Sequence, residues 1–274
     1  MIKKRFLKIA ILAITVSIMA LICAIAIIGA SETKSYTVSY YSNGVLAQSI
    51  PLQEGTKHIV LSTPFASNNA NKQFYGWYDE TGKFYKNMEI TVNKNYTFYE
   101  AYGMIVTDKS EFVRAIGQAG NYVRLGASIT LDEVITLPTN GLVIIDLNGY
   151  DITVTSEEYA FYTENASVHI LNSSTTGTGK ITHTGVATNL DLMNASLFRF
   201  APSLKKNASI HLFKNANIQS NVGLFDIVSD LTYSKYTYNI DVDSAISGEF
   251  IVRTYGIIPI TVPTNNLVKF SLCL

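Results

Sequence analysis

The side chains that could do chemistry in this chain lie mostly in short apolar–polar–apolar segments. Asp241 and Asp243 flank Val242 and point to the same side of a predicted strand, because side chains alternate along a strand. Such a pair could bind Ca²⁺ or serve as the acid and base of a glycosidase, whose carboxylates lie about 5–10 Å apart. We favour a solvent-exposed strand face, because acidic side chains are mostly exposed.

Four histidines are present: His58, His169, His183 and His211. His169 and His211 occupy the same place in two similar segments, so they could face the same side and form a metal pair. They are 42 residues apart, which predicts two turns of a repeat between them. Two strand spacings amount to about 9–10 Å, too long for shared ligation, and no metal site is predicted.

A polysaccharide lyase would need acidic Ca²⁺ ligands near an arginine base. Asp146 is explained instead as a turn-forming residue before Asn148-Gly149. No motif of a zinc protease, a serine hydrolase or a phosphate-binding loop occurs. We therefore predict no catalytic, cofactor-binding or metal-binding residue, and no enzyme. We expect none of the arginines after residue 104 to cluster with acids. They are Arg114 on a predicted helix, Arg124 in a predicted strand, Arg199 and Arg253.

The composition favours a mainly all-β protein without a nucleic-acid partner. The 274 residues include 21 basic and 21 acidic side chains, and nucleic-acid binding normally needs a basic excess. The 17 Tyr and 13 Phe, with many Val, Ile and Thr, are typical of strands. Cys23 and Cys273 alone cannot form a disulfide framework.

Residues 1–30 have the pattern of an export segment. Met1–Lys8 carries four basic charges, and the twenty residues Ile9–Ile28 carry none. Twenty apolar residues are longer than a usual signal-peptide core and can span a bilayer of about 30 Å. The segment is therefore either a signal peptide cleaved after Ala30 or an uncleaved membrane anchor. Lipidation of Cys23 is not expected, because Ile22 before it is not small.

Residues 36–103 predict a small β module of short strands with a turn every eight to twelve residues. Trp77 is the one Trp; it could stack on a sugar, but we favour a core position beside Phe74, with Gly76 allowing close backbone approach. The predicted strands and turns are Tyr36–Tyr41, the turn Ser42-Asn43-Gly44, His58–Leu61, Phe74–Trp77, the turn Asp79–Gly82, Lys83–Tyr85, Ile90–Val92 and Tyr96–Tyr102.

This module resembles the Listeria–Bacteroides repeat, the B-repeat of internalins and related surface proteins. The resemblance implies a β-grasp-like fold with a spacer or interaction role and no catalysis. Tyr102 stands where the family's final strand ends in Trp. The segments that carry the likeness are Val38-Ser39-Tyr40, Asn43-Gly44, Phe74-Tyr75-Gly76-Trp77-Tyr78 and Thr97-Phe98-Tyr99.

Residues 104–274 predict a stack of short strands closed at one end by a helix. Asp108 and Glu111 form a capping-box pattern that starts a helix of about ten residues, which Gly117 and Gly120 end. Apolar–polar–apolar segments then recur around Ile145, Ile170, Leu212 and Val242, at intervals of 25, 42 and 30 residues. We read these intervals as one turn, two turns, and one turn with an insertion. Leu267–Leu274 is one more strand, after which the stack is either open or truncated.

The start of this region is similar to pectate-lyase-like right-handed parallel β-helices of bacterial adhesin-like proteins. The likeness covers about residues 104–184 and fades afterwards. It rests on Ile145-Asp146-Leu147-Asn148-Gly149, Val168–Ile170 and Gly177-Thr178-Gly179-Lys180-Ile181.

Together these features predict a non-catalytic surface or secreted protein of a low-GC Gram-positive bacterium or relative. It would be adhesin-like or a spacer, with a glycan or protein ligand, and held at the membrane by residues 9–28 if these stay uncleaved. The alternative is a divergent β-helix polysaccharide lyase or glycosidase, which would need outward carboxylates and a basic residue converging in one groove.

Overall fold

A computed structural model describes most of the chain between residues 33 and 220 and the backbone of later strands. The described ranges are 33–66, 71–117, 122–184, 196–200, 208–213, 215–220, 223–227, 238–242, 245–247, 250–254, 260–261 and 270–273, with Ile14, Thr15 and Ser17. The predicted signal or anchor segment 9–28 lies almost wholly outside these ranges. Among the described residues, the structure has no helix with the length and apolar character needed to cross a membrane.

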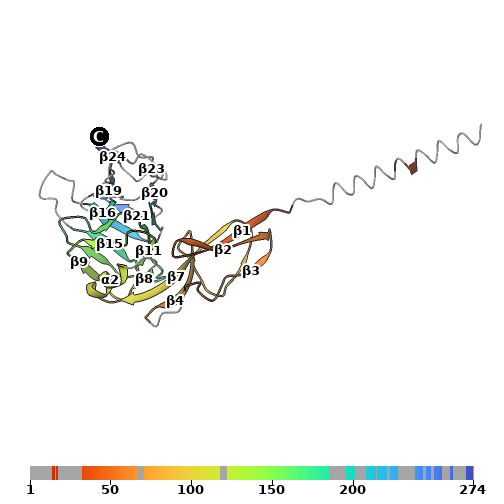
Figure 1. Ribbon diagram of the computed structural model, residues 1–274, viewed down its shortest axis with the longest axis horizontal. Coiled ribbons are helices and arrows are strands. Elements are labelled where there is room, and N and C mark those ends of the chain that lie inside the picture. Colours follow the sequence, from red (N-terminus) through yellow and green to blue (C-terminus); the bar gives the residue numbers. More distant parts are fainter. Residues whose placement is uncertain are drawn as a thin grey trace, which may run out of the picture.

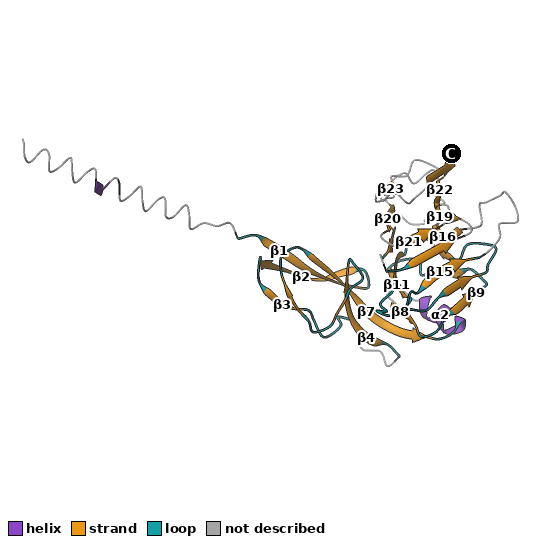
Figure 2. Cartoon of the chain, turned by 180° about the vertical axis from the view of Figure 1, so that it is seen from behind, coloured by secondary structure: helices purple, strands orange, loops and turns teal. Residues whose placement is uncertain are grey.

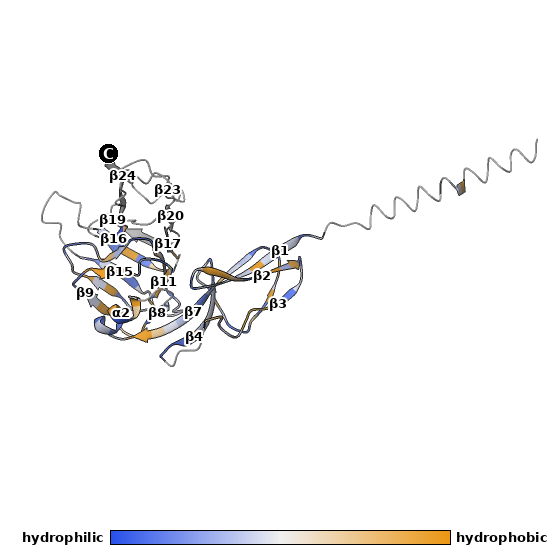
Figure 3. Ribbon diagram, viewed as in Figure 1, coloured by the Kyte–Doolittle hydropathy of each residue, from blue (hydrophilic) through white to orange (hydrophobic). Residues whose placement is uncertain are grey.

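The structure is mostly β, as the composition predicts. Strands make up 52% of it, and the helix α2 (Lys109–Ile116) stands among them in Figure 2. Hydrophobic and hydrophilic stretches mix along the strands in Figure 3, as expected where one face of a strand is buried.

The first part of the chain is a small β unit around a compact aromatic core. Asn43 and Gly44 have φ angles of 52° and 74°, which build the predicted hairpin turn between the first two strands. The core includes Val38, Tyr40, Trp77 and Phe98, all fully buried. The strands are β1 (Ser35–Ser42), β2 (Val45–Gln53), β3 (Lys57–Ile59), β4 (Gln73–Asp79), β5 (Phe84–Tyr85), β6 (Glu89–Thr91) and β7 (Tyr96–Val106).

Strand β7 belongs to both parts of the chain. Its first half pairs with β1 and β4, and its second half, from Gly103 to Val106, pairs with β8 (Tyr122–Leu125). The predicted boundary at residues 103 and 104 therefore falls inside a strand. Figure 1 shows β7 curving from one part into the other, so that one sheet of eleven strands runs through both.

After α2, successive strands go in turn to three sheets whose neighbouring strands are parallel. The first sheet continues from β8 with β11 (Leu142–Asp146), β14 (Ser167–Leu171), β17 (Ala208–Leu212), β20 (Tyr238–Val242) and β23 (Ile260–Thr261). The second holds β9 (Ile129–Leu131), β12 (Ile152–Val154), β15 (Lys180–His183), β18 (Asn217–Ser220) and β21 (Ala245–Ser247). The third holds β10 (Ile135–Thr136), β13 (Phe161–Thr163), β16 (Ser196–Phe200), β19 (Gly223–Ile227), β22 (Phe250–Thr254) and β24 (Phe270–Cys273).

The register confirms the predicted stacking and corrects one interval. Ile145 lies beside Ile170, Ile170 beside Leu212, and Leu212 beside Val242. The interval of 42 residues is thus one turn and not two, because β17 pairs directly with β14. Extra residues in a connection lengthen a turn without adding a strand to the sheet, so sequence distance alone does not count turns.

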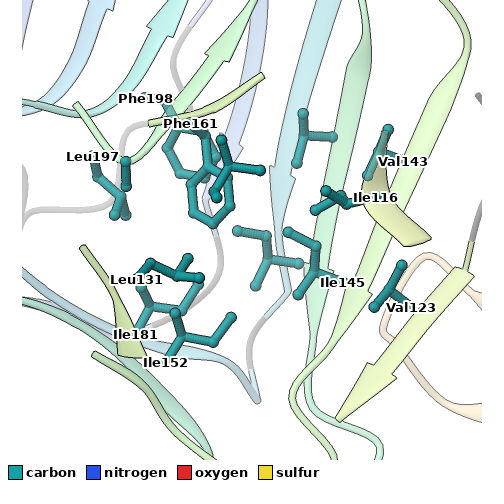
Figure 4. Close-up of a cluster of buried hydrophobic side chains, with 14 of the residues drawn as sticks. Ile116, Val123, Leu131, Val143, Ile145, Ile152, Phe161, Ile181, Leu197 and Phe198 are labelled. Carbon is teal, nitrogen blue, oxygen red and sulfur yellow. The ribbon is translucent and has the colours of Figure 1, made fainter. Parts of the chain in front are cut away.

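The three sheets enclose one apolar core, and α2 covers its first end. Phe112, Ala115 and Ile116 of α2 are buried in this core with Val123 and Ile145. Figure 4 shows side chains from the different sheets pointing inward toward one another. The Asp108 carboxylate accepts the Glu111 N–H at 2.8 Å, as the capping pattern predicts. The helix ends at Ile116, just before Gly117, the first of the two glycines predicted to end it.

Candidate functional site

Asp146, at the end of β11, is fully buried and fully engaged by hydrogen bonds. Its carboxylate accepts the Asn148 N–H at 3.0 Å, the Ser173 N–H at 2.8 Å and the Ser173 hydroxyl at 2.5 Å. The Tyr122 hydroxyl also donates to it. The contact to Asn148 confirms the predicted turn-forming role, and the remaining donors tie the turn of Asp146 to the turn before it, through Tyr122, and to the turn after it, through Ser173.

Arg124 corrects the expectation that no arginine lies near an acid. Its Nε is 3.8 Å from the Asp146 carboxylate, and its Nη2 donates to the Asn148 side-chain oxygen at 2.5 Å. The guanidinium also lies over the Tyr75 ring, 5.4 Å from its centre. Burial, with the Asp146 charge next, raises the pKa of Tyr122 well above its usual value, so Tyr122 stays a neutral donor. The single acid of this cluster is already bonded to four donors, so the cluster is structural.

Asparagines line one corner of the parallel region, where sequence analysis gave a role only to Asn148. The Asn172 side-chain oxygen accepts the Gly149 N–H at 2.7 Å, and its amide donates to the Gly177 carbonyl at 3.0 Å. Asn215 donates in turn to the Asn172 carbonyl. A signal for this corner is present in the sequence: an Asn follows shortly after the strand in two successive repeats, at Leu147-Asn148 and Leu171-Asn172.

His169 and His211 lie on neighbouring strands, so the expected separation of two turns was wrong. Their ring centres are 5.5 Å apart. His169 does not face solvent: it is buried against the first part of the chain, and its Nδ1 is 2.9 Å from the Tyr78 hydroxyl. Burial, with His211 adding to it, lowers the pKa of His169 to about 3. Among the described residues, no group of three or more His, Cys, Asp and Glu side chains is placed to hold a metal ion.

The other histidines have separate structural contacts. His58 Nε2 is 2.7 Å from the Tyr40 hydroxyl, and His183 Nε2 is 3.1 Å from the Glu158 carbonyl oxygen. Desolvation lowers the pKa of both. Neither lies in a cluster of metal ligands.

The structure separates the remaining sequence candidates. Asp241 lies in β20 beside His211, but its side chain and all of Asp243 lie outside the described residues. Arg114 is on α2 as expected. Arg199 of β16 lies 5.2 Å from the centre of the Tyr159 ring, and for Arg253 of β22 the backbone alone is described.

Trp77 is a core residue, as expected. It is fully buried, with its ring centre 5.8 Å from that of Phe74, and it offers no surface to a sugar. Gly76 beside it has φ 138°, and a Cβ there would lie 2.7 Å from the Tyr85 carbonyl oxygen. The close backbone approach predicted for Gly76 is therefore present.

A cluster of buried and half-buried aromatic and apolar side chains, here the aromatic seam, joins the first part of the chain to the parallel region. Tyr78 packs edge-on against Phe213, at 5.6 Å between ring centres, and stacks on Tyr99 at 5.3 Å. Tyr78 and Tyr99 face away from the aromatic core of the first part and toward the parallel region, and this places them in the seam. Sequence analysis did not assign this contact. The members of the seam are Tyr75, Tyr78, Phe84, Tyr99, Ala101, Tyr122, Leu142, Ile144, Leu171 and Phe213.

Two grooves with polar walls lie at this junction. The larger, here the Thr81 groove, has a volume of about 390 Å³, and the smaller, here the Asn43 groove, about 270 Å³. The Thr81 groove is lined by Thr81, Gly82, Lys83 and Phe84 from the first part, and by Asn172, Ser173, Ser174, Thr175 and Asn215 from the parallel region. The Asn43 groove is lined by Asn43, Gly44, Val45, Asn140, Gly141, Asn165 and Ser167.

Hydroxyl and amide side chains are among the residues that line both grooves, and no carboxylate lines either one. Glycoside hydrolysis needs two carboxylates on either side of the bond, and a lyase needs acidic ligands for Ca²⁺. Neither groove carries that set of carboxylates among its lining residues. Comparisons of the chain with protein-family models, with curated proteins and with solved structures find no match.

Proposed function

We propose that this chain is an exported bacterial surface protein with a non-catalytic, adhesin-like binding or spacer role. The basic residues Met1–Lys8 followed by the uncharged segment Ile9–Ile28 support export. The protein would be secreted if this segment is cleaved and membrane-anchored if it is not. Nucleic acid is not a partner, because the charges balance at 21 basic and 21 acidic residues.

The fold that we propose for residues 104–274 is a right-handed parallel β-helix, preceded by a B-repeat-like module. Three observations support the β-helix: successive strands join three parallel sheets in turn, residues of the same type stack on one another in neighbouring turns, and α2 covers the first end of the core. For the module, the support is the Gly76-Trp77-Tyr78 segment on β4, which contributes Trp77 to its core and Tyr78 to the aromatic seam.

One observation carries the proposed role: the two parts share strand β7 and the buried aromatic seam. A shared strand and a buried interface hold the two parts in a fixed arrangement, which suits a rigid spacer or a preorganised binding surface. A flexible tether between them would instead be rich in Gly, Ser or Pro.

The alternative is a divergent β-helix lyase or glycosidase. Arg124 beside Asp146 is the observation that favours it, because a lyase of this fold needs an arginine base. Against it, Asp146 has no exposed surface and is bonded to Tyr122, Asn148 and Ser173.

The test uses the full chain, expressed in a Gram-positive host and also purified in mild detergent. Fractionation and mass spectrometry of the N-terminus report export and cleavage. Product analysis on polygalacturonate, alginate and neutral glycans reports catalysis. We expect the chain outside the cytoplasm and no product from any polymer; a cytoplasmic chain or a new reducing or unsaturated end would overturn the proposal.

A further inference from the structure

We propose that the Thr81 groove is a saccharide-binding site that takes one or two sugar rings through their vicinal hydroxyls. This inference rests on the proposed binding role and gives it a place and a ligand class. The groove volume of about 390 Å³ is in the range of small-molecule sites, which begins near 300 Å³.

The polar wall from the parallel region is fixed before any ligand arrives. The Ser174 hydroxyl oxygen accepts the Gly177 N–H at 2.8 Å and the Thr176 N–H at 3.2 Å. Asn172 is held by its bonds to Gly149 and Gly177. Groups that are already positioned lose little entropy on binding, so a shallow groove of this kind can bind a small polar ligand.

The opposite wall is fixed by Asp79. Its carboxylate accepts the Thr81 N–H at 2.8 Å, the Thr81 hydroxyl at 2.6 Å and the Lys83 N–H at 3.2 Å. Gly82 between them has φ 77°, and a Cβ there would lie 3.3 Å from the Asn215 side-chain oxygen. Glycine at this position therefore lets the turn approach Asn215 of the parallel region closely.

Hydrogen-bonding capacity remains on both walls. Ser174 accepts two bonds and keeps its own O–H to donate, and the exposed Thr175 offers a hydroxyl. Lys83 is exposed, with its ammonium 4.9 Å from the centre of the Tyr85 ring, and the half-buried Phe84 adds an apolar surface. Donors, acceptors and an aromatic side chain without a carboxylate match the hydroxyls and the apolar face of a sugar ring.

The test compares groove variants with controls of the same chemistry outside the groove. Thr175→Val removes the groove hydroxyl, and Thr176→Val removes one from the next exposed residue, which does not line the groove. Lys83→Met removes the ammonium of a residue that lines the groove, and Lys94→Met removes one that also lies over a tyrosine, 5.2 Å from the Tyr96 ring centre. All four positions are exposed, so the fold is not expected to change.

Each full-length variant is titrated with cellobiose, maltose, chitobiose and digalacturonate by calorimetry and saturation-transfer NMR. We expect at least one disaccharide to bind, Thr175→Val to weaken binding about threefold to tenfold, and Lys83→Met to weaken digalacturonate most. The controls, Thr176→Val and Lys94→Met, should bind like the wild type.

The outcomes separate the two proposals. If no disaccharide binds, or if groove and control variants bind equally, the Thr81 groove is not the site, while the exported, non-catalytic role stands. If digalacturonate is converted to product, the non-catalytic role fails whatever the groove variants do.

Discussion

Replacing Gly103 by alanine should separate the two parts of the chain at the strand they share. Gly103 lies on β7 between Gln73 of β4 and Tyr122 of β8. A Cβ at this position would overlap the Tyr122 carbonyl oxygen and lie 2.6 Å from its carbonyl carbon. Both are backbone atoms, so no side-chain rotation can relieve the clash.

The size of the effect follows from the opening that alanine forces. Ordinary contact begins at 3.4 Å, whereas the Cβ would lie 1.6 Å from the Tyr122 carbonyl oxygen and 2.6 Å from its carbonyl carbon, so the oxygen must retreat by about 1.8 Å and the carbon by about 0.8 Å. A strand–strand hydrogen bond of about 2.9 Å would then exceed the usual limit of about 3.2 Å. Losing two or three such bonds at about 1 kcal/mol each, with the packing of Tyr122, gives about 3 kcal/mol or more. For a chain of this size that corresponds to a fall in Tm of about 6–12 °C.

Thermal unfolding of the full chain, followed by circular dichroism, measures this fall. The control is Gly117→Ala at the end of α2, where φ is −66° and a Cβ would lie 3.5 Å from the Val113 carbonyl oxygen. This control should unfold within about 1 °C of the wild type. If Gly103→Ala also unfolds within 1 °C of the wild type, β7 and β8 are not in contact as described, and the argument for a shared strand fails.

Three further changes test other parts of the structure. Asp146→Ala leaves the Tyr122 and Ser173 donors without their buried acceptor and should lower the free energy of unfolding by about 3–5 kcal/mol in urea titration; a loss below 1 kcal/mol would contradict the network. Because the folded pKa of His169 is about 3 and the usual value is 6.5, the unfolded chain binds the extra proton between these values. The free energy of unfolding should therefore fall by about 1.4 kcal/mol for each pH unit below 6.5, and His169→Gln should flatten that slope. An unchanged slope in the variant would refute the burial of a neutral His169. Phe161→Ala removes a fully buried ring stacked 5.1 Å from Phe198 and should cost about 3–5 kcal/mol, whereas an unchanged urea midpoint would place Phe161 outside the core.

Local patterns in the sequence were enough to predict most of the elements. The hairpin at Asn43-Gly44, the capped helix after Asp108 and the stacking of Ile145 on Ile170 all depend on a few neighbouring residues or on strand alternation. The core position of Trp77 followed from its aromatic surroundings. The hairpin, helix and Trp77 signals each lie within one short segment, whereas the stacking was predicted from similar segments that recur along the chain.

The features that sequence analysis missed all depend on contacts between distant segments. Arg124 and Asp146 meet because their strands are neighbours, although 22 residues separate them. The pairing of His169 with His211 depends on the length of a connection, which strand patterns do not report. Tyr78 and Trp77 point to opposite faces of β4. No local pattern predicts that the face of Tyr78 packs against a second apolar surface.

The shared strand also decides where the Thr81 groove lies. Because β7 pairs with β4 on one side and with β8 on the other, its register fixes Tyr78 against His169 of β14. The turn that follows Tyr78 is then held opposite Asn172 and Asn215, and these two segments form the walls of the groove. A slip of one residue in β7 would turn its side chains to the opposite face and break both the aromatic seam and the groove. Binding at the groove and the joining of the two parts are therefore one structural property, and a variant that loosens β7 from β8 should weaken saccharide binding without altering any residue that lines the groove.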